Sequence, residues 1–198
     1  RVPAVPLGVD PRFRPNARSE APESFSSLGL HRGEYSLFVG TVEPRKNLDR
    51  LLIAYASLPE DLRRRWPLVL VGDRGWRSTE THARIAAAAS EGWLRYLSFV
   101  DDDLLPALYA HARLFVYPSL YEGFGLPPLE AMASGVPVVA SAVASIPEVV
   151  GTSALMIDPL STTELKAALE IGLEDEIWRV RARDAGLSRA AKFTWDAC

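Results

Sequence analysis

Short apolar runs alternate with helical segments along most of this chain. Runs rich in Val, Leu, Ile and aromatic residues occupy residues 36–40, 68–72, 94–100, 114–117, 136–141 and 154–157. Their lengths and their Gly or Pro boundaries are typical of buried strands. Segments of helical character lie between and after these runs, at residues 48–55, 79–90, 104–111, 128–134, 164–173 and 175–192. We expect Asn47 to cap the first of these helices, and Ser161 or Thr162 to cap the fifth.

The regular alternation predicts an α/β domain built on a doubly wound parallel sheet of about six strands. Right-handed crossovers bring the loops after successive strands to one edge of such a sheet, where open α/β sheets bind ligands. We expect the domain to span residues 35–198. Residues 1–34 hold five prolines and little periodicity, which predicts an extended lead-in or linker.

The stretch from residue 117 to residue 135 has the most distinctive pattern. A strand end is followed by a loop in which Gly123 and Gly125 allow close approach of the backbone to a ligand, and then by a helix start. Glu122 in the loop and Glu130, expected in the first helical turn, can both face the ligand edge. Helix N-termini favour anions. A ligand with a phosphate for the amides and hydroxyl groups for the carboxylates fits this pattern, and a sugar nucleotide has both.

A second charged loop follows the first predicted strand. Arg45 and Lys46 lie there, close to the start of the next helix. Charge-assisted hydrogen bonds are worth about 1.5–3 kcal/mol each, against about 0.3–1 kcal/mol for an exposed helix dipole. The two side chains would therefore dominate a diphosphate site. A basic pair in a loop is more often merely solvated, but its place at the ligand edge favours binding here.

Composition narrows the function classes. The 198 residues are 48% hydrophobic and 24% charged, as in soluble globular proteins, and the net charge of −3 argues against a nucleic-acid partner. The single cysteine, Cys198, gives no disulfide framework and suits the cytoplasm. No apolar run approaches the roughly 20 residues of a membrane-spanning helix. The chain starts without Met and stops at Cys198, so we expect it to be part of a larger protein.

Other chemistries fit less well. The paired carboxylates could serve a hydrolase, but one lies in a loop and the other beside the expected phosphate site. His31, His82 and His111 are scattered without ligand spacing, so we expect no metal site. The chain lacks a Gly-x-Ser-x-Gly nucleophile turn, and the loop after the second strand lacks a dinucleotide fingerprint. We expect the five tryptophans to serve core or rim packing rather than carbohydrate stacking.

Four segments together resemble the family 4 retaining glycosyltransferases of the GT-B architecture. They are residues 38–48 (Phe-Val-Gly-Thr-Val-Glu-Pro-Arg-Lys-Asn-Leu), 70–76, 104–119 and 122–149, the last with its Glu-x7-Glu pattern. The resemblance covers about residues 35–195 and is to the C-terminal, donor-binding domain, a Rossmann-like half of the enzyme. It implies that the N-terminal acceptor domain is absent from this sequence.

The resemblance implies roles by position. Arg45 and Lys46 would hold the donor diphosphate and Glu122 would bind hydroxyls of the transferred sugar, so these three are the expected catalytic residues. Glu130 would bind the ribose diol, and the backbone near Val100 would contact the base. Further donor contacts are expected at Gly40, Thr41, Gly123, Phe124, Gly125 and Leu126.

The resemblance also implies transfer of a hexose with retention of configuration, without a metal or other cofactor, to a sugar or lipid-linked acceptor. Residues 43–47 and the Gly75-Trp76 pair favour GDP-mannose as the donor, with UDP-sugars left open. Ser98 stands where the family usually has glycine, in the expected base pocket. We expect a cytoplasmic enzyme, with contact to the inner membrane face through the missing domain left open. The isolated chain should bind nucleotide but transfer sugar poorly or not at all. Two alternatives remain: a sugar-nucleotide epimerase of the same fold, and a non-catalytic nucleotide-binding module.

Overall fold

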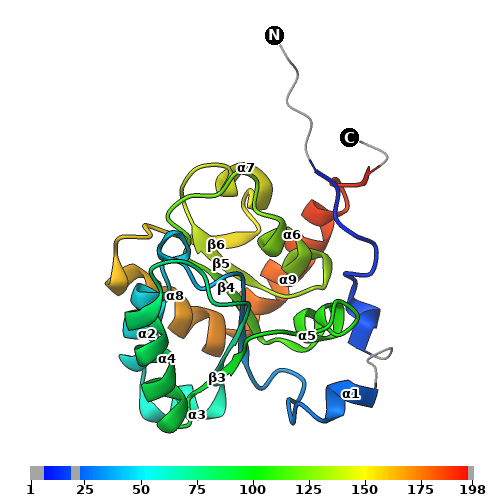
Figure 1. The fold of residues 1–198 in the computed structure, drawn as a ribbon. Helices are drawn as coiled ribbons and strands as arrows, with labels where there is room; N and C mark the ends of the chain where they lie inside the picture. Colours follow the sequence, from blue (N-terminus) through cyan, green and yellow to red (C-terminus); the bar gives the residue numbers. More distant parts are fainter. Residues whose placement is uncertain (1–6, 19–22, 196–198) are drawn as a thin grey trace.

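The computed structural model describes residues 7–18 and 23–195 and shows a parallel sheet with helices on both faces (Figure 1). Six strands lie in the order β3-β2-β1-β4-β5-β6, and every neighbouring pair is parallel. The strands are β1 (Ser36–Val39), β2 (Leu68–Val71), β3 (Leu94–Leu97), β4 (Leu114–Tyr117), β5 (Val138–Ser141) and β6 (Ala154–Ile157). The predicted Rossmann-like α/β class is confirmed.

Helices cover the sheet in two layers. One layer holds α2 (Leu48–Ala56), α4 (Thr79–Ser90) and α8 (Thr162–Glu174), and the other holds α5 (Leu105–His111), α6 (Leu126–Ala133) and α9 (Glu176–Ala190) (Figure 1). Shorter elements fill the connections: α1 (Glu23–Ser26), α3 (Glu60–Arg65), α7 (Ile146–Val150) and the 3-10 turns η1 (Pro15–Arg18) and η2 (Pro44–Lys46). Within the described residues, no helix combines the length and the apolar character needed to cross a membrane.

The central strands are buried on both faces. Ser36 of β1 pairs in register with Leu68 of β2 on one side and with Leu114 of β4 on the other, and all three are fully buried. Strands covered on both faces read as continuous apolar runs rather than as alternating ones, which is why the pattern predicted them well. The edge strand β3 is different, because it exposes Arg95 and ends at Leu97 rather than at Val100 as predicted.

The start of α6 also differs from the prediction. The helix begins at Leu126, after Gly125 takes a left-handed conformation with φ 106°. Pro127 and Pro128 then lie in the first turn, where a missing N–H costs little because those groups have no partner in the helix. Glu130 therefore lies in the second turn, and its expected place in the first turn was wrong. The short helices α1, α3 and α7 have no counterpart among the predicted elements.

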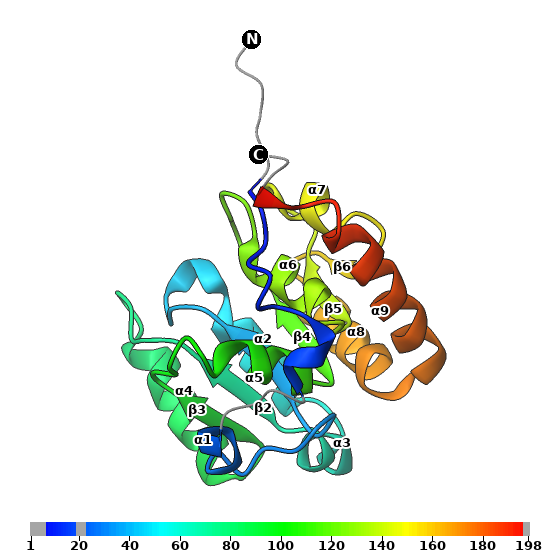
Figure 2. The same cartoon turned by 90° about the vertical axis from the view of Figure 1, so that its right-hand side faces the viewer.

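The described lead-in is not simply extended, as predicted, because it contains η1 and α1 and packs in part against the domain. Phe13 is buried and meets the ring of Tyr109 edge-on, with ring centroids 5.3 Å apart. The backbone N–H of Val9 donates to the carbonyl of Phe193 at 3.0 Å, which joins the two ends of the described chain. Figure 2 shows this segment in blue, crossing in front of α5 and α6. Residues 1–6 and 19–22 of the predicted lead-in, and Cys198, lie outside the described residues, and the role of interdomain linker stays a prediction.

Candidate functional site

The site lies where the strand order reverses, between β1 and β4. Neighbouring strands at this point continue in opposite directions across the sheet, so the loops after them leave a crevice at the carboxyl edge. The two loops contact each other directly, because the backbone N–H of Leu120 donates to the carbonyl of Arg45 at 2.8 Å. The two charged loops found in the sequence therefore meet at one edge, as the alternation predicted.

Asn47 ties the two loops together. It occupies the N-cap position of α2, as predicted, but it is left-handed with φ 58° and its side chain caps nothing. Its Nδ2 instead donates to the carbonyls of Pro118 at 2.9 Å and Pro159 at 2.7 Å. A single buried amide thus holds the loops after β1, β4 and β6 in a fixed relation.

Lys46 is buried at the centre of the site, with 7% of its surface exposed. Its Nζ lies 2.7 Å from Oε1 of Glu122 and 2.6 Å from the hydroxyl of Tyr117. That hydroxyl in turn donates to the same Oε1 at 2.9 Å, so the three groups form a closed triangle. Gly40 leaves room for this arrangement, because a Cβ at that position would lie 3.3 Å from Cε of Lys46.

Arg45 approaches the same carboxylate from the outside. Its Nη1 lies 2.7 Å from Oε2 of Glu122 and 3.0 Å from the carbonyl of Tyr121. Its Nε and Nη2 both donate to Oε1 of Glu43, at 3.1 and 2.7 Å. We call Glu43, Arg45, Lys46, Tyr117 and Glu122 the switch-point cluster. Two formal positive and two formal negative charges leave it with no net charge.

The cluster sets the ionisation of its members. Burial would raise the pKa of Glu122, but the hydrogen bond and charge of Lys46 outweigh burial and lower that pKa. Burial and the neighbouring Glu122 carboxylate raise the pKa of Tyr117, so its hydroxyl stays protonated. Burial would lower the pKa of Arg45, but Glu122 outweighs it and raises the pKa. Glu122 is therefore a carboxylate at neutral pH, held by two cations.

Glu130 stands apart from this cluster, on α6. Its Oε2 accepts a hydrogen bond of 2.9 Å from the hydroxyl of Tyr109 on α5. Burial raises the pKa of Glu130, which the Tyr109 bond only partly offsets, and nearby Asp10 raises it further. The structure thus brings Arg45, Lys46 and Glu122 together, and gives Glu130 different partners.

Ser145 contacts the backbone of the glycine-rich loop between the two glutamates. The hydroxyl of Ser145 lies 2.9 Å from the carbonyl oxygen of Glu122 and 2.8 Å from that of Phe124, and its one proton is shared between them. Gly123 is exposed, and a Cβ there would meet nothing within 4 Å. The remaining predicted donor contacts, Gly40, Thr41, Val100, Gly125 and Leu126, lie in or next to the loops that follow β1, β3 and β4. Their roles stay predictions.

Two tyrosines were missed by the sequence analysis. Tyr117 and Tyr109 each hydrogen-bond one of the two predicted glutamates, yet in the sequence they look like apolar core residues. Their burial beside a carboxylate is a feature of the fold that spacing does not show. His82 and His111 are not part of the site, because His82 meets the ring of Tyr96 and His111 that of Phe25. No group of three or more His, Cys, Asp or Glu side chains in residues 7–18 and 23–195 could hold a metal ion.

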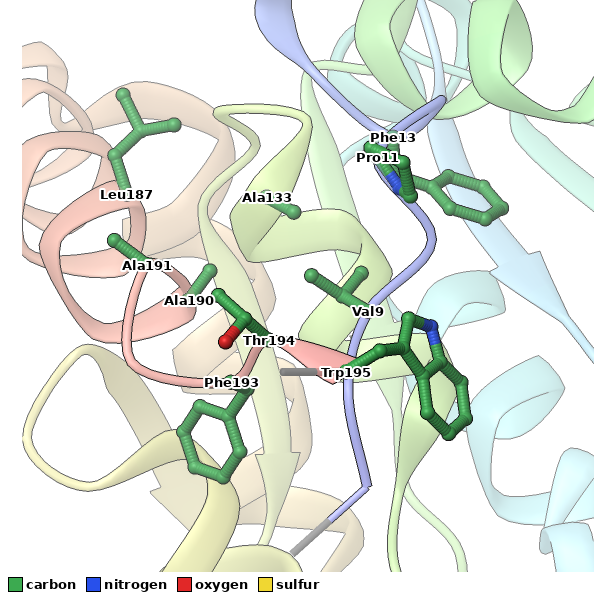
Figure 3. A pocket seen from close by; sticks show the side chains of 10 residues that line it. All are labelled: Val9, Pro11, Phe13, Ala133, Leu187, Ala190, Ala191, Phe193, Thr194 and Trp195. Carbon is green, nitrogen blue, oxygen red and sulfur yellow. The ribbon is translucent and has the colours of Figure 1, made fainter. Parts of the chain in front are cut away.

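A cavity of about 540 Å³ lies elsewhere, between the lead-in, α6, α9 and the C-terminal segment (Figure 3). Val9, Phe13, Phe193 and Trp195 are among the side chains around it, and none of its lining residues is titratable. An apolar cavity without charged groups has no means of holding a diphosphate. The switch-point cluster therefore remains the candidate site.

Comparison with known proteins identifies the family of the chain. The family model for glycosyl transferases group 1 matches residues 21–189. The O-antigen chain mannosyltransferase B of Escherichia coli is 44% identical over the whole chain, which covers 52% of that protein. The serotype-specific mannosyltransferase WbdA of Escherichia coli is 39% identical over 82% of this chain and 20% of its own length.

A solved structure supports the same relation. WaaG, a glycosyltransferase involved in lipopolysaccharide biosynthesis, superposes with a TM-score of 0.79 and 26% identity, covering 94% of this chain and 51% of its own. The chain thus spans about half the length of the first of these relatives and of WaaG, and a fifth of WbdA. It belongs to the group 1 glycosyltransferases and corresponds to the C-terminal domain of a GT-B enzyme of family 4.

Proposed function

We propose that this chain is the donor-binding half of an enzyme that transfers a hexose, with mannose favoured, from a nucleoside diphosphate sugar to a sugar or lipid-linked acceptor. The observation that carries the proposal is the meeting of Arg45, Lys46 and Glu122 at the switch point of the sheet. Cations for a diphosphate and a carboxylate for sugar hydroxyls lie there within hydrogen-bonding distance of each other.

Lys46 is the group best suited to the diphosphate. Its ammonium carries three protons, and Tyr117 and Glu122 accept two of them. The third is left for a phosphate oxygen. As the bond between the sugar and the diphosphate breaks, negative charge grows on the leaving group, and cations fixed in a buried site stabilise it most at that moment. Such electrostatic help needs no metal, and a metal-free reaction with retention is part of the proposal.

The two glutamates would bind the hydroxyl groups of the donor. Glu122, an ionised carboxylate with fixed orientation, would accept hydrogen bonds from hydroxyls of the transferred sugar. Tyr109 holds Oε2 of Glu130, which leaves Oε1 to accept from the ribose diol. The mannosyltransferase names of two relatives support mannose, and GDP is the nucleotide we favour, with UDP as the second choice.

The two alternative functions would require different residues at the site. An epimerase should place a histidine beside the carboxylates, whereas His82 and His111 pack against aromatic rings elsewhere. A non-catalytic module would need no fixed carboxylate at the sugar position. We also propose that the chain alone does not turn over, because we expect most of the acceptor site in the other half of the relatives' length.

Calorimetric titration of the chain with GDP, UDP and ADP tests the proposal. We expect saturable binding that is tightest for GDP and is weakened at least tenfold, about 1.4 kcal/mol, by Lys46→Ala. Lys166→Ala is the matched control, because Lys166 forms a surface pair with Glu170 at 3.1 Å and should leave binding unchanged. Absence of binding to all three nucleotides would refute the donor-binding role, and equal loss in both variants would refute the role of Lys46.

A further inference from the structure

Trp76 is an exposed aromatic side chain beside the switch-point cluster. It follows β2 at the carboxyl edge of the sheet and has 57% of its surface exposed. Trp66 and Trp93 are buried, with 5% and 4% exposed. An indole left in water forgoes the stabilisation that burial would give it. Core packing therefore explains Trp66 and Trp93 but not Trp76.

The indole is nevertheless fixed in place. Its Nε1 donates to Oε2 of Glu43 at 3.0 Å, while Oε1 of the same carboxylate holds Arg45. The loop that carries Trp76 is anchored to the loop after β1, since the backbone N–H of Gly75 donates to the carbonyl of Val42 at 3.0 Å. Only glycine fits at position 75, because a Cβ would lie 2.8 Å from that carbonyl oxygen.

The neighbouring Arg77 adds a cation to this surface. Its backbone takes φ 46°, a left-handed conformation that costs free energy for a residue other than glycine. Its guanidinium carbon lies 5.7 Å from the centre of the Trp76 ring. The result is an exposed indole with a guanidinium, rich in hydrogen-bond donors, over its ring.

A continuous chain of contacts leads from Trp76 to the candidate reaction site. Trp76 bonds to Glu43, Glu43 to Arg45 at 2.7 Å, and Arg45 to Glu122 at 2.7 Å. Glu43 takes the Nε and Nη2 edge of the guanidinium, whereas Glu122 takes its Nη1 end. Along this path the Glu122 side chain is 9% exposed, that of Arg45 38% and that of Glu43 14%, and Trp76 at its end is the most exposed at 57%. Trp76 therefore lies at the open end of the site.

We propose that Trp76 and Arg77 form a binding site for a pyranose of the acceptor glycan. The C–H bonds on one face of a pyranose ring are weakly positive and stack on the negative face of an indole. The ring hydroxyls of such a sugar would accept hydrogen bonds from Arg77. The inference rests on the proposed function, in which Lys46, Glu122, Glu130 and the backbone near Val100 are already assigned to the diphosphate, the sugar, the ribose and the base of the donor.

Titration of the chain, labelled with 15N at tryptophan, with methyl α-mannobioside and separately with GDP tests this site by NMR. We expect the indole resonance of Trp76 to shift with the glycoside, with a Kd in about the millimolar range. Trp76→Phe, which keeps an aromatic face, should bind within about threefold of the wild type, and Trp76→Ala at least about tenfold more weakly. Trp195 is the internal control, because it is equally exposed, at 56%, but lies beside the apolar cavity.

Two results would overturn the inference. A Trp76 resonance that stays still throughout the glycoside titration shows that the surface binds no such sugar. A resonance that moves with GDP but not with the glycoside assigns the indole to the nucleotide instead. Failure of the proposed function would look different, because the wild-type chain would then show no GDP-dependent change at any of its resonances.

Discussion

Glu122→Gln removes one negative charge from the switch-point cluster while keeping the size of the side chain. Lys46 and Arg45 then face a neutral amide, although the Lys46 side chain is only 8% exposed. Breaking a buried ion pair by neutralising one partner costs about 3–5 kcal/mol. For a domain of this size each kcal/mol lowers Tm by about 2–4 °C, so we expect Tm to fall by about 6–20 °C.

Nucleotide should reverse part of this loss. The wild-type cluster has no net charge, whereas that of the variant is formally +1, so an incoming diphosphate gains a favourable interaction. At an effective dielectric constant of 20, two unit charges 4 Å apart interact by about 4 kcal/mol. We take a third of that value as a lower bound and expect GDP to bind the variant at least about tenfold more tightly than the wild type.

Calorimetry and thermal melts with and without GDP measure both effects. Glu170→Gln is the matched control: it neutralises the Glu170–Lys166 surface pair, which is 3.1 Å long. Exposed helix pairs of this kind contribute about 0.3–0.5 kcal/mol, so the control should melt close to the wild type and bind GDP equally. Weaker GDP binding by Glu122→Gln would refute the reasoning, because it would show that Glu122 does not compete with the diphosphate for the two cations.

Three further predictions follow from neighbouring contacts. Asn47→Asp should destabilise the chain more than Asn47→Ala, because a carboxylate would face the two carbonyls that now accept from Nδ2. An unsatisfied buried group costs about 1–3 kcal/mol. Urea melts that rank the two variants in the opposite order would contradict this prediction. Burial raises the pKa of Glu130, so ionisation of this carboxyl group opposes folding. Glu130→Gln should therefore be more stable than the wild type at neutral pH. The difference in stability should disappear as the pH falls below 4.5, the ordinary pKa of a glutamate. The pKa of Glu122 is lowered, so ionisation of this carboxyl group stabilises the fold. The stability lost in Glu122→Gln should be largest above pH 4.5 and should shrink as the pH falls through the lowered pKa. A loss of stability that does not change with pH would contradict the ion pairing of Glu122.

Much of the fold could be predicted because central parallel strands leave a strong signal. The apolar runs ending at Val39, Val71 and Tyr117 are buried on both faces, and each ends within a residue of its predicted boundary. The predicted end of the edge strand β3 was the least accurate. Phe99 and Val100 continue its apolar character, but Phe99 is 72% exposed and the strand ends at Leu97. At a sheet edge, hydrophobicity does not separate strand from loop.

The meeting of the two charged loops at one edge of the sheet could be predicted from the sequence, but the contacts between their side chains could not. The sequence gives no sign that Lys46 and Arg45 share one carboxylate, because this follows from β1 lying beside β4. The contacts of the Tyr117 hydroxyl could not be predicted for a similar reason, since a tyrosine at the end of a buried strand resembles an ordinary core residue. Glu130 was placed one turn too early because two adjacent prolines leave the first residue of the helix undecided.

The central claim is that one nucleotide sugar spans the switch-point cluster and Glu130. A crystal structure of the chain with bound GDP tests it most directly. We predict a phosphate oxygen within hydrogen-bonding distance of Nζ of Lys46, and the ribose hydroxyls on the free oxygen of Glu130. A diphosphate bound away from Lys46, or a ribose that leaves Glu130 in contact with Tyr109 alone, would contradict the account.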